Sequence, residues 1–188
     1  MSKIITVMDG SLASVRDRSL RTRVYTSDIV WRAVSSLKKF NHFKIFSGKG
    51  GIWRFWDRRL ERYLREHNSA DNDLICIGKS AGAYDTVKVL EEIDDDLKYR
   101  SVYLILIDPC HITKIFKRRR SLIMIPKCVK HCACFFQKRG ILKGSIAATQ
   151  SLKTYIDNVP IVRPDINHFN IALQPEVQDA IVSALEAE

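Results

Sequence analysis

Short apolar runs alternate with segments of helical periodicity along nearly the whole chain. The apolar runs, each a predicted strand, are residues 3–8, 43–46, 73–77, 102–107, 129–136 and 159–162. The helical segments are residues 28–40, 52–66, 81–93, 146–155 and 175–185. Apolar strands separated by helices are typical of a parallel sheet covered on both faces. We therefore expect an α/β fold with a doubly wound, mostly parallel sheet of about six strands.

The chain has 188 residues, which is the size of one domain. No internal repeat and no Ser-, Gly- or Pro-rich linker divides it, so residues 1–188 are predicted to form a single domain. The one irregular insertion, residues 109–126, lies between two predicted strands. Apolar runs stay below the roughly 18–20 residues that span a bilayer. Asp9 ends the first run too early for a signal peptide, so we expect a cytoplasmic protein.

The charge is unusual, with 31 Lys and Arg against 21 Asp and Glu, a net charge of +10. The excess is concentrated in residues 1–70, with 15 basic and 6 acidic side chains, and in residues 101–144, with 10 and 1. The second stretch contains the 109–126 insertion, where apolar residues flank the four cations of Lys117–Arg120. Such a mixture suits contact with an anionic lipid surface or an anionic substrate, and would also suit phosphate backbones.

The cysteines predict free thiols rather than a disulfide framework or a metal site. Their number, five, is odd, and no secretory signal accompanies them. Cys128, Cys132 and Cys134 lie near His131 and His111, but their spacing matches no common zinc pattern. Alternation along residues 129–136 would put Cys132 and Cys134 on one face of a strand. We expect buried, apolar thiols and no metal.

The most informative motif is Gly78-Lys79-Ser80-Ala81-Gly82, because an apolar strand precedes it and a helical segment follows it directly. G-x-S-x-G in this setting is typical of a nucleophile elbow, in which Ser80 stands on a sharp turn at a helix N-terminus. The Ala81 N–H is then a natural oxyanion donor. A phosphate-binding loop ending in Gly78-Lys79-Ser80 is rejected, since it requires glycine where the chain has Asp73.

A serine nucleophile needs a base, and His168 is the best candidate. It follows the last predicted strand and precedes the last helix, so it is expected at the same sheet edge as Ser80. His111 is its main rival.

The base in turn needs an orienting carboxylate. Asp108 ends the strand after the elbow and is followed by Pro109, which favours it, with Asp165 as a fallback. A second oxyanion donor is assigned to the turn after Asp9-Gly10, at the N–H of Ser11 or Leu12.

These residues together resemble the α/β-hydrolase superfamily, in a short form and over nearly the whole chain. Gly82-Ala83-Tyr84 after the serine, with an acid one strand after the elbow, is similar to the lipase and phospholipase branches. The resemblance implies hydrolysis of an ester or thioester through an acyl-enzyme, without a cofactor. The chain departs from the superfamily in its small size, which leaves little room for a lid domain, and in Lys79 beside the serine.

The expected function is therefore that of a serine hydrolase. Ser80 would be its nucleophile, His168 its base and Asp108 its acid, with Ala81 and Ser11 at the oxyanion. Its substrate would be a small-molecule or lipid ester. The alternative is a non-catalytic α/β domain that binds nucleic acid or a protein partner through its basic surface.

Overall fold

The computed structural model of the chain describes residues 2–9, 42–47, 58–110, 122–138, 144–168 and 170–187. Its centre is a six-stranded sheet in the order β2-β1-β3-β4-β6-β8. Every neighbouring pair in this sheet is parallel. The strands are β1 (Ser2–Asp9), β2 (His42–Ser47), β3 (Asn72–Lys79), β4 (Ser101–Ile107), β6 (His131–Gln137) and β8 (Tyr155–Ile161). The predicted parallel α/β architecture is confirmed.

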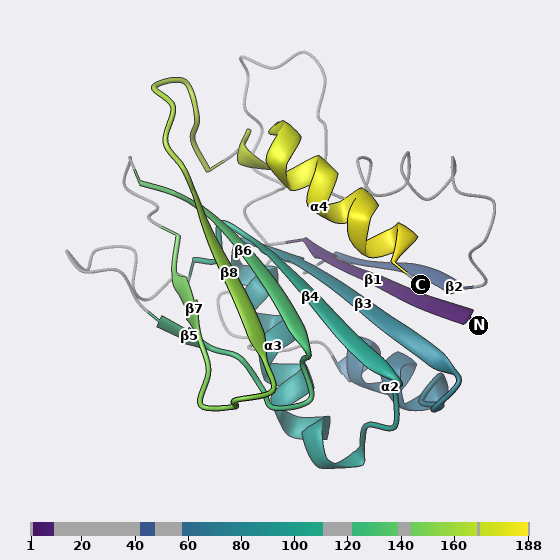
Figure 1. Ribbon diagram of the computed structural model, residues 1–188. Helices are drawn as coiled ribbons and strands as arrows, with labels where there is room; N and C mark the ends of the chain where they lie inside the picture. The colour runs from purple at the N-terminus through teal and green to yellow at the C-terminus, as the bar shows by residue number, and fades with distance from the viewer. Residues whose placement is uncertain are drawn as a thin grey trace.

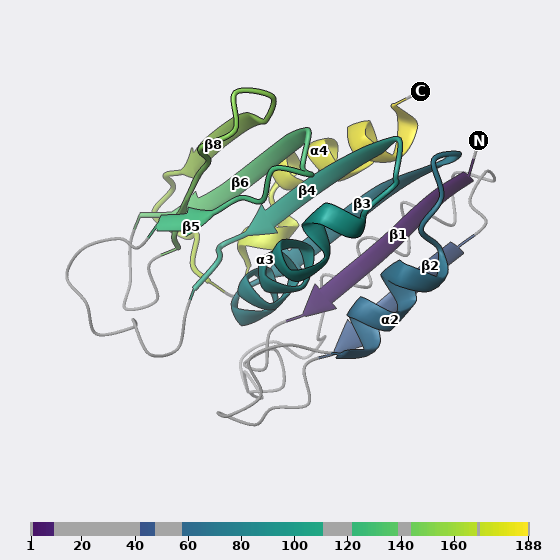
Figure 2. The same ribbon diagram turned by 90° about the horizontal axis from the view of Figure 1, so that it is seen from below.

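Helices cover both faces of this sheet, giving three layers (Figures 1 and 2). The helices α2 (Arg58–Glu66) and α3 (Ala81–Ile93) lie on one face, and α4 (Pro175–Glu186) lies on the other. Two short 3-10 turns, η2 (Asp94–Asp96) and η4 (Ile171–Leu173), follow α3 and precede α4. No helix in the described ranges is long and apolar enough to cross a membrane.

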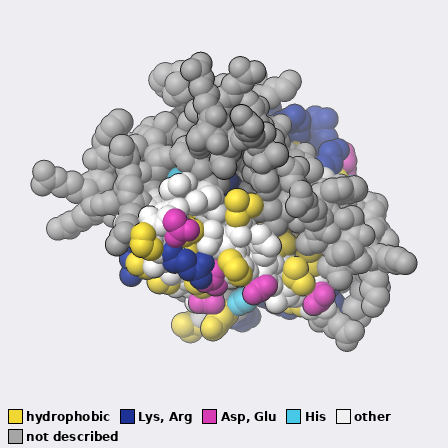
Figure 3. Space-filling view, turned by 90° about the horizontal axis from the view of Figure 1, so that it is seen from above, with side chains coloured by type: hydrophobic (Ala, Val, Ile, Leu, Met, Phe, Trp, Pro, Cys, Tyr) yellow, Lys and Arg dark blue, Asp and Glu magenta, His cyan; other side chains and the backbone are white. Residues whose placement is uncertain are grey.

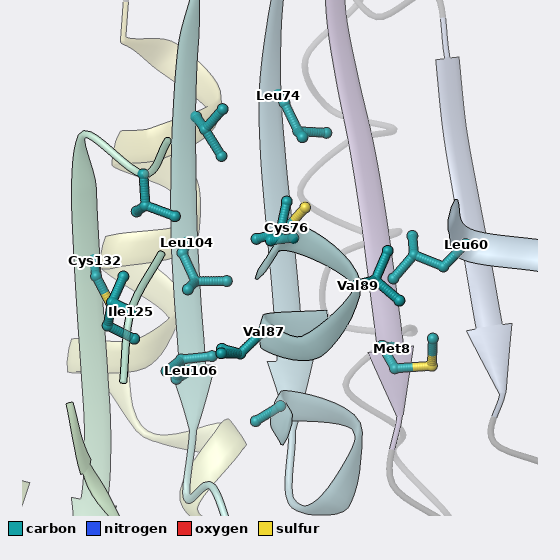
Figure 4. Close-up of a cluster of buried hydrophobic side chains, with 14 of the residues drawn as sticks. Met8, Leu60, Leu74, Cys76, Val87, Val89, Leu104, Leu106, Ile125 and Cys132 are labelled. Atoms are coloured by element: carbon teal, nitrogen blue, oxygen red, sulfur yellow. The ribbon is translucent and has the colours of Figure 1, made fainter. Parts of the chain in front are cut away.

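Two layers of buried side chains hold the helices to the sheet. On the α3 face, Leu74 and Leu104 from the strands belong to the same buried cluster as Val87 and Val89 of the helix (Figure 4). On the α4 face, Ile75 and Ile105 belong to the same buried cluster as Ile181. Successive strand residues therefore enter opposite cores, which explains why these strands read as unbroken apolar runs. Fully burying a side chain of this size contributes about 1.5–3 kcal/mol.

The region after β4 differs from the prediction in two ways. The expected helix over residues 146–155 is wrong. This segment instead contains β7 (Ile146–Ala148) and continues into β8. In addition, the insertion 109–126 is not wholly irregular, because its end forms β5 (Leu122–Met124), which pairs in parallel with β7.

A side chain ties this small second sheet to the main one. Asn158 of β8 accepts a hydrogen bond from the Ala147 backbone N–H and donates one to its carbonyl, each 3.0 Å long. The Asn158 carboxamide thus makes the two hydrogen bonds to the Ala147 backbone that a neighbouring strand would otherwise make. The strands β5 and β7 of this sheet are separated by residues 125–145, so local periodicity could not reveal their pairing.

Because the main strands are parallel, their carboxyl ends share one edge of the sheet. The strand order reverses at β1, which has β2 on one side and β3 on the other. Ligands of open α/β sheets bind at the carboxyl edge near such a reversal. Ser80 follows β3 and Asp108 follows β4 at this edge.

Candidate active site

Ser80 lies on a sharp turn between β3 and α3. Its backbone angles, φ 57° and ψ −125°, fall in a region that L-residues rarely adopt. Its N–H donates to the Ile107 carbonyl over 3.0 Å, which fixes the turn against β4. Ala81 begins α3 at the predicted residue, and its N–H belongs to the helix N-terminus. The predicted strand and helix on either side of a sharp turn at Ser80 are confirmed.

The two glycines of the motif allow the turn to pack closely. A Cβ on Gly78 would lie 2.6 Å from Ala83 Cα, and one on Gly82 would lie 2.4 Å from the Met8 carbonyl oxygen. Both obstacles are backbone atoms that cannot rotate away. Any larger residue at either position would therefore push α3 from the sheet and displace Ser80.

His168 bridges Ser80 and Asp108. Its Nε2 lies 2.8 Å from Ser80 Oγ, and its Nδ1 lies 2.6 Å from Asp108 Oδ2. An ionised carboxylate only accepts hydrogen bonds, so Nδ1–H is the donor to Asp108. In the neutral imidazole Nε2 is then an acceptor, and the Ser80 hydroxyl donates to it. The three predicted side chains thus form one hydrogen-bonded chain.

The loop that carries His168 is stabilised by two asparagines. The Asn167 N–H donates to Asn170 Oδ1 over 2.8 Å, and the Asn170 N–H donates to Asn167 Oδ1 over 3.3 Å. Asn170 Nδ2 also donates to the Asp165 carbonyl over 2.9 Å. The buried Ile166 anchors the loop in the core of the α4 face. The asparagine pair was not predicted, although its spacing around His168 could have suggested it.

Asp108 is fully buried and accepts two hydrogen bonds. Besides His168, it receives the Gln137 backbone N–H at Oδ1 over 3.1 Å. Its φ of 45° turns the chain sharply at the end of β4, and its own N–H donates to the Phe135 carbonyl over 2.7 Å. A Cβ on Gly144 would lie 2.2 Å from Oδ1. Gln137 and Gly144 were missed because they act through backbone atoms or through the lack of a side chain.

The environment of His168 favours its protonated form. Burial lowers the pKa of His168, but the hydrogen bond to Asp108, together with the Cys110 sulfur, outweighs burial. The pKa rises from its ordinary 6.5 to about 9. The neutral imidazole that a general base requires therefore forms fully only in alkaline solution.

A fourth side chain, Cys110, adjoins this chain of hydrogen bonds and was not predicted to take part. Its Sγ lies 3.2 Å from Ser80 Oγ and 3.9 Å from His168 Nε2. The only sequence signal was its position, two residues after the acid in Asp108-Pro109-Cys110.

The remaining candidates lie elsewhere or outside the described residues. Asp165 is exposed, and Asp108 is the carboxylate that bonds His168. His131 stacks on Tyr155 near the amino ends of β6 and β8. Ser11 and His111 fall outside the described residues, as does the predicted helix 28–40.

All five cysteines are free thiols, and four of them are buried as predicted, whereas Cys128 is partly exposed. Cys132 and Cys134 share the core cluster of the α3 face, and neither is exposed. Within the described ranges, no three His, Cys, Asp or Glu side chains are grouped as a metal ion would need.

Comparison with known proteins supports the fold class and identifies no family or function. No family model matches the chain, and no curated protein sequence matches it. Solved structures with a similar fold exist. Among them is the crystal structure of the products of gene lin2722 from Listeria innocua, which has a TM-score of 0.58 and 9% sequence identity to this chain. The match covers 100% of this chain and 95% of that chain. At so low an identity, the similarity supports the α/β fold alone.

Proposed function

We propose that the protein is a serine hydrolase that cleaves carboxylic esters through an acyl-Ser80 intermediate. The observation that carries the proposal is the hydrogen-bonded chain from Ser80 through His168 to the buried Asp108. The strained backbone of Ser80 at the start of α3 supports it, because strain of this kind accompanies nucleophiles on elbows. The resemblance of the motifs to the α/β-hydrolase superfamily agrees with this reading.

The proposed reaction has two halves. In the first, His168 Nε2 takes the Ser80 hydroxyl proton as Oγ attacks the acyl carbonyl, and the imidazolium is stabilised by Asp108. The oxyanion accepts a hydrogen bond from the Ala81 N–H at the positive end of α3. The imidazolium then protonates the leaving alcohol. In the second half, His168 activates water, which releases the acid and restores Ser80.

The proposed substrate class is a small-molecule or lipid ester, as in esterases, lipases and phospholipases. The four cations of Lys117–Arg120 support an anionic group on the substrate or at a lipid surface, since they follow in the sequence soon after Asp108, which lies at the carboxyl edge. Over the described part of the face in Figure 3, basic and acidic side chains lie among apolar ones.

Turnover of p-nitrophenyl esters of increasing acyl length tests the proposal. The wild-type protein should hydrolyse at least one member of the series catalytically, and the length dependence should identify the acyl chain that the site accepts. His168→Ala should reduce kcat/KM by about 10²–10⁴-fold. His67→Ala is the matched control, because His67 bonds the Tyr63 carbonyl at the end of α2 and should leave the rate unchanged. Equal rates for the wild type and His168→Ala would refute the proposal.

A further inference from the structure

Cys110 lies where an acyl group bound at Ser80 would be within its reach. Its Sγ is 3.2 Å from Ser80 Oγ, so a carbonyl carbon in position for attack by the oxygen is also close to the sulfur. The two side chains are equally buried, at 3% exposure each. A reagent that reaches Ser80 therefore also reaches Cys110.

The position of the thiol is fixed by backbone contacts on both sides of its turn. The Cys110 N–H donates to the Ser80 carbonyl over 3.3 Å, and the Pro109 carbonyl accepts the Ser145 N–H over 2.6 Å. The left-handed φ of Asp108 directs the chain back toward the elbow. Because these contacts are independent of the Ser80 hydroxyl, the sulfur should stay in place when that hydroxyl is removed.

Cys110 also differs from the other described cysteines in having a base beside it. His168 Nε2 is 3.9 Å from its sulfur. By contrast, burial raises the pKa of Cys76 and Cys134 to about 12, and no histidine of the described residues contributes to either shift. Burial also raises the pKa of Cys128 and Cys132. Only the thiolate is an effective nucleophile, so those four thiols are expected to be inert.

We propose that Cys110 is a second nucleophile of this site, served by the same His168–Asp108 pair and able to take acyl groups from activated esters as a thioester. This inference rests on the proposed function for the role of His168. In the wild type Ser80 is closer to Nε2, at 2.8 Å, and reacts first. When the Ser80 hydroxyl is removed, the His168 imidazole is available to accept the proton of the Cys110 thiol.

Acylation of Cys110 needs no reactant other than the ester. His168 Nε2 takes the Cys110 thiol proton as Sγ attacks the carbonyl carbon and forms the S–C bond. The tetrahedral intermediate collapses, the C–O bond to the leaving group breaks, and the imidazolium returns its proton to the departing oxygen. The products are a Cys110 thioester and the free alcohol or phenol.

The test is acylation of Ser80→Ala by p-nitrophenyl acetate, followed by mass spectrometry of its peptides. We expect release of one equivalent of p-nitrophenol and one acetyl group on the Cys110 peptide, removable by neutral hydroxylamine. Ser80→Gly, which suits the left-handed backbone at this position, provides a second background should Ser80→Ala fold poorly. Ser80→Ala/Cys110→Ala should gain no acetyl group, and Ser80→Ala/His168→Ala should react about 10²-fold more slowly.

Absence of the acetyl group from Cys110 in both folded backgrounds would overturn the inference, as would equal acetylation with and without His168. Either result would leave the proposed function intact if the wild type still turns over esters through Ser80. Conversely, a wild type that shows no turnover while Ser80→Ala acylates Cys110 would refute the serine hydrolase and retain the thiol nucleophile. The proposed serine hydrolase and the proposed Cys110 nucleophile can therefore be refuted independently of each other.

Discussion

His168 Nε2 lies 2.8 Å from Ser80 Oγ, although the two residues are 88 positions apart in the sequence. The parallel sheet brings them together, because the elbow after β3 and the loop after β8 emerge at the same edge. The serine comes from the turn into one helix, and the histidine comes from the loop that leads toward another. Their contact therefore depends on the whole fold.

Asp108→Asn should reduce ester hydrolysis by about 10⁴-fold, because an amide in place of the carboxylate favours the wrong imidazole tautomer and does not stabilise the imidazolium. Steady-state kinetics with a p-nitrophenyl ester measures the effect. Asp165→Asn is the matched control, since this exposed residue is also near His168 in the sequence. A large loss in Asp165→Asn, with activity kept in Asp108→Asn, would reverse the assignment of the acid.

The rate should rise with pH across the neutral range. His168 must be neutral to accept the Ser80 proton, and its pKa is raised from 6.5 to about 9. The protein should therefore be slow below pH 6.5, where the imidazole is protonated, and become faster as pH approaches 9. A profile of kcat/KM against pH should show a midpoint above 6.5. A plateau already reached at pH 6 would contradict the raised pKa.

The raised pKa of His168 also predicts how stability depends on pH. Protonated His168 paired with Asp108 stabilises the folded state fully below the unfolded-state value of 6.5. This contribution should disappear as pH rises through about 9. The difference in Tm between the wild type and His168→Ala should consequently narrow between pH 6 and pH 9. A difference that widens over this range would mean that the histidine is held neutral by the fold.

Ser80→Gly should stabilise the protein while abolishing turnover. A φ of 57° strains serine but suits glycine, so we expect a gain of about 1 kcal/mol. That corresponds to a Tm about 2–4 °C higher for a chain of this size. Ser80→Ala removes the same hydroxyl without relieving the strain and is the matched comparison. Equal melting temperatures for the two variants would argue against a strained elbow.

Gly144→Ala should impair catalysis by displacing Asp108, since its Cβ would lie 2.2 Å from the carboxylate oxygen. A shift of this acid by about 1 Å should reduce kcat about 10²-fold. Kinetics and thermal unfolding should be measured together, so that loss of activity in a folded protein is recognised. Gln150→Ala, on the exposed part of the same segment, should change neither quantity. Full activity in Gly144→Ala would show that the acid tolerates this displacement.

The sequence allowed most of the sheet and the three central side chains to be predicted. Each depended on a strong local signal. The apolar runs mark strands buried on both faces, and the glycines of the elbow mark a turn with no space for side chains. His168 and Asp108 could be placed because parallel strands put their carboxyl ends at one edge, so chain order indicated which residues meet.

The parts that could not be predicted depend on contacts between distant segments. Residues 146–155 have apolar spacing compatible with a helix, but Ile146–Ala148 is a strand because β5 and Asn158 supply its partners. Likewise, Cys110 reaches the site only because Asp108 adopts a left-handed turn, which no local pattern indicated. The backbone roles of Gln137 and Gly144 have no side-chain signature.

Labelling with a fluorophosphonate probe, mapped by mass spectrometry, tests the proposed serine hydrolase most directly. Such probes react with serines activated by a neighbouring base. We expect a single phosphonate adduct on Ser80 of the wild type, strongly reduced labelling in His168→Ala, and unchanged labelling in Ser183→Ala, whose serine is exposed on α4. A wild-type protein that acquires no adduct at Ser80, or a Ser80→Ala variant that labels equally well at another serine, would contradict the assignment of Ser80 as the nucleophile.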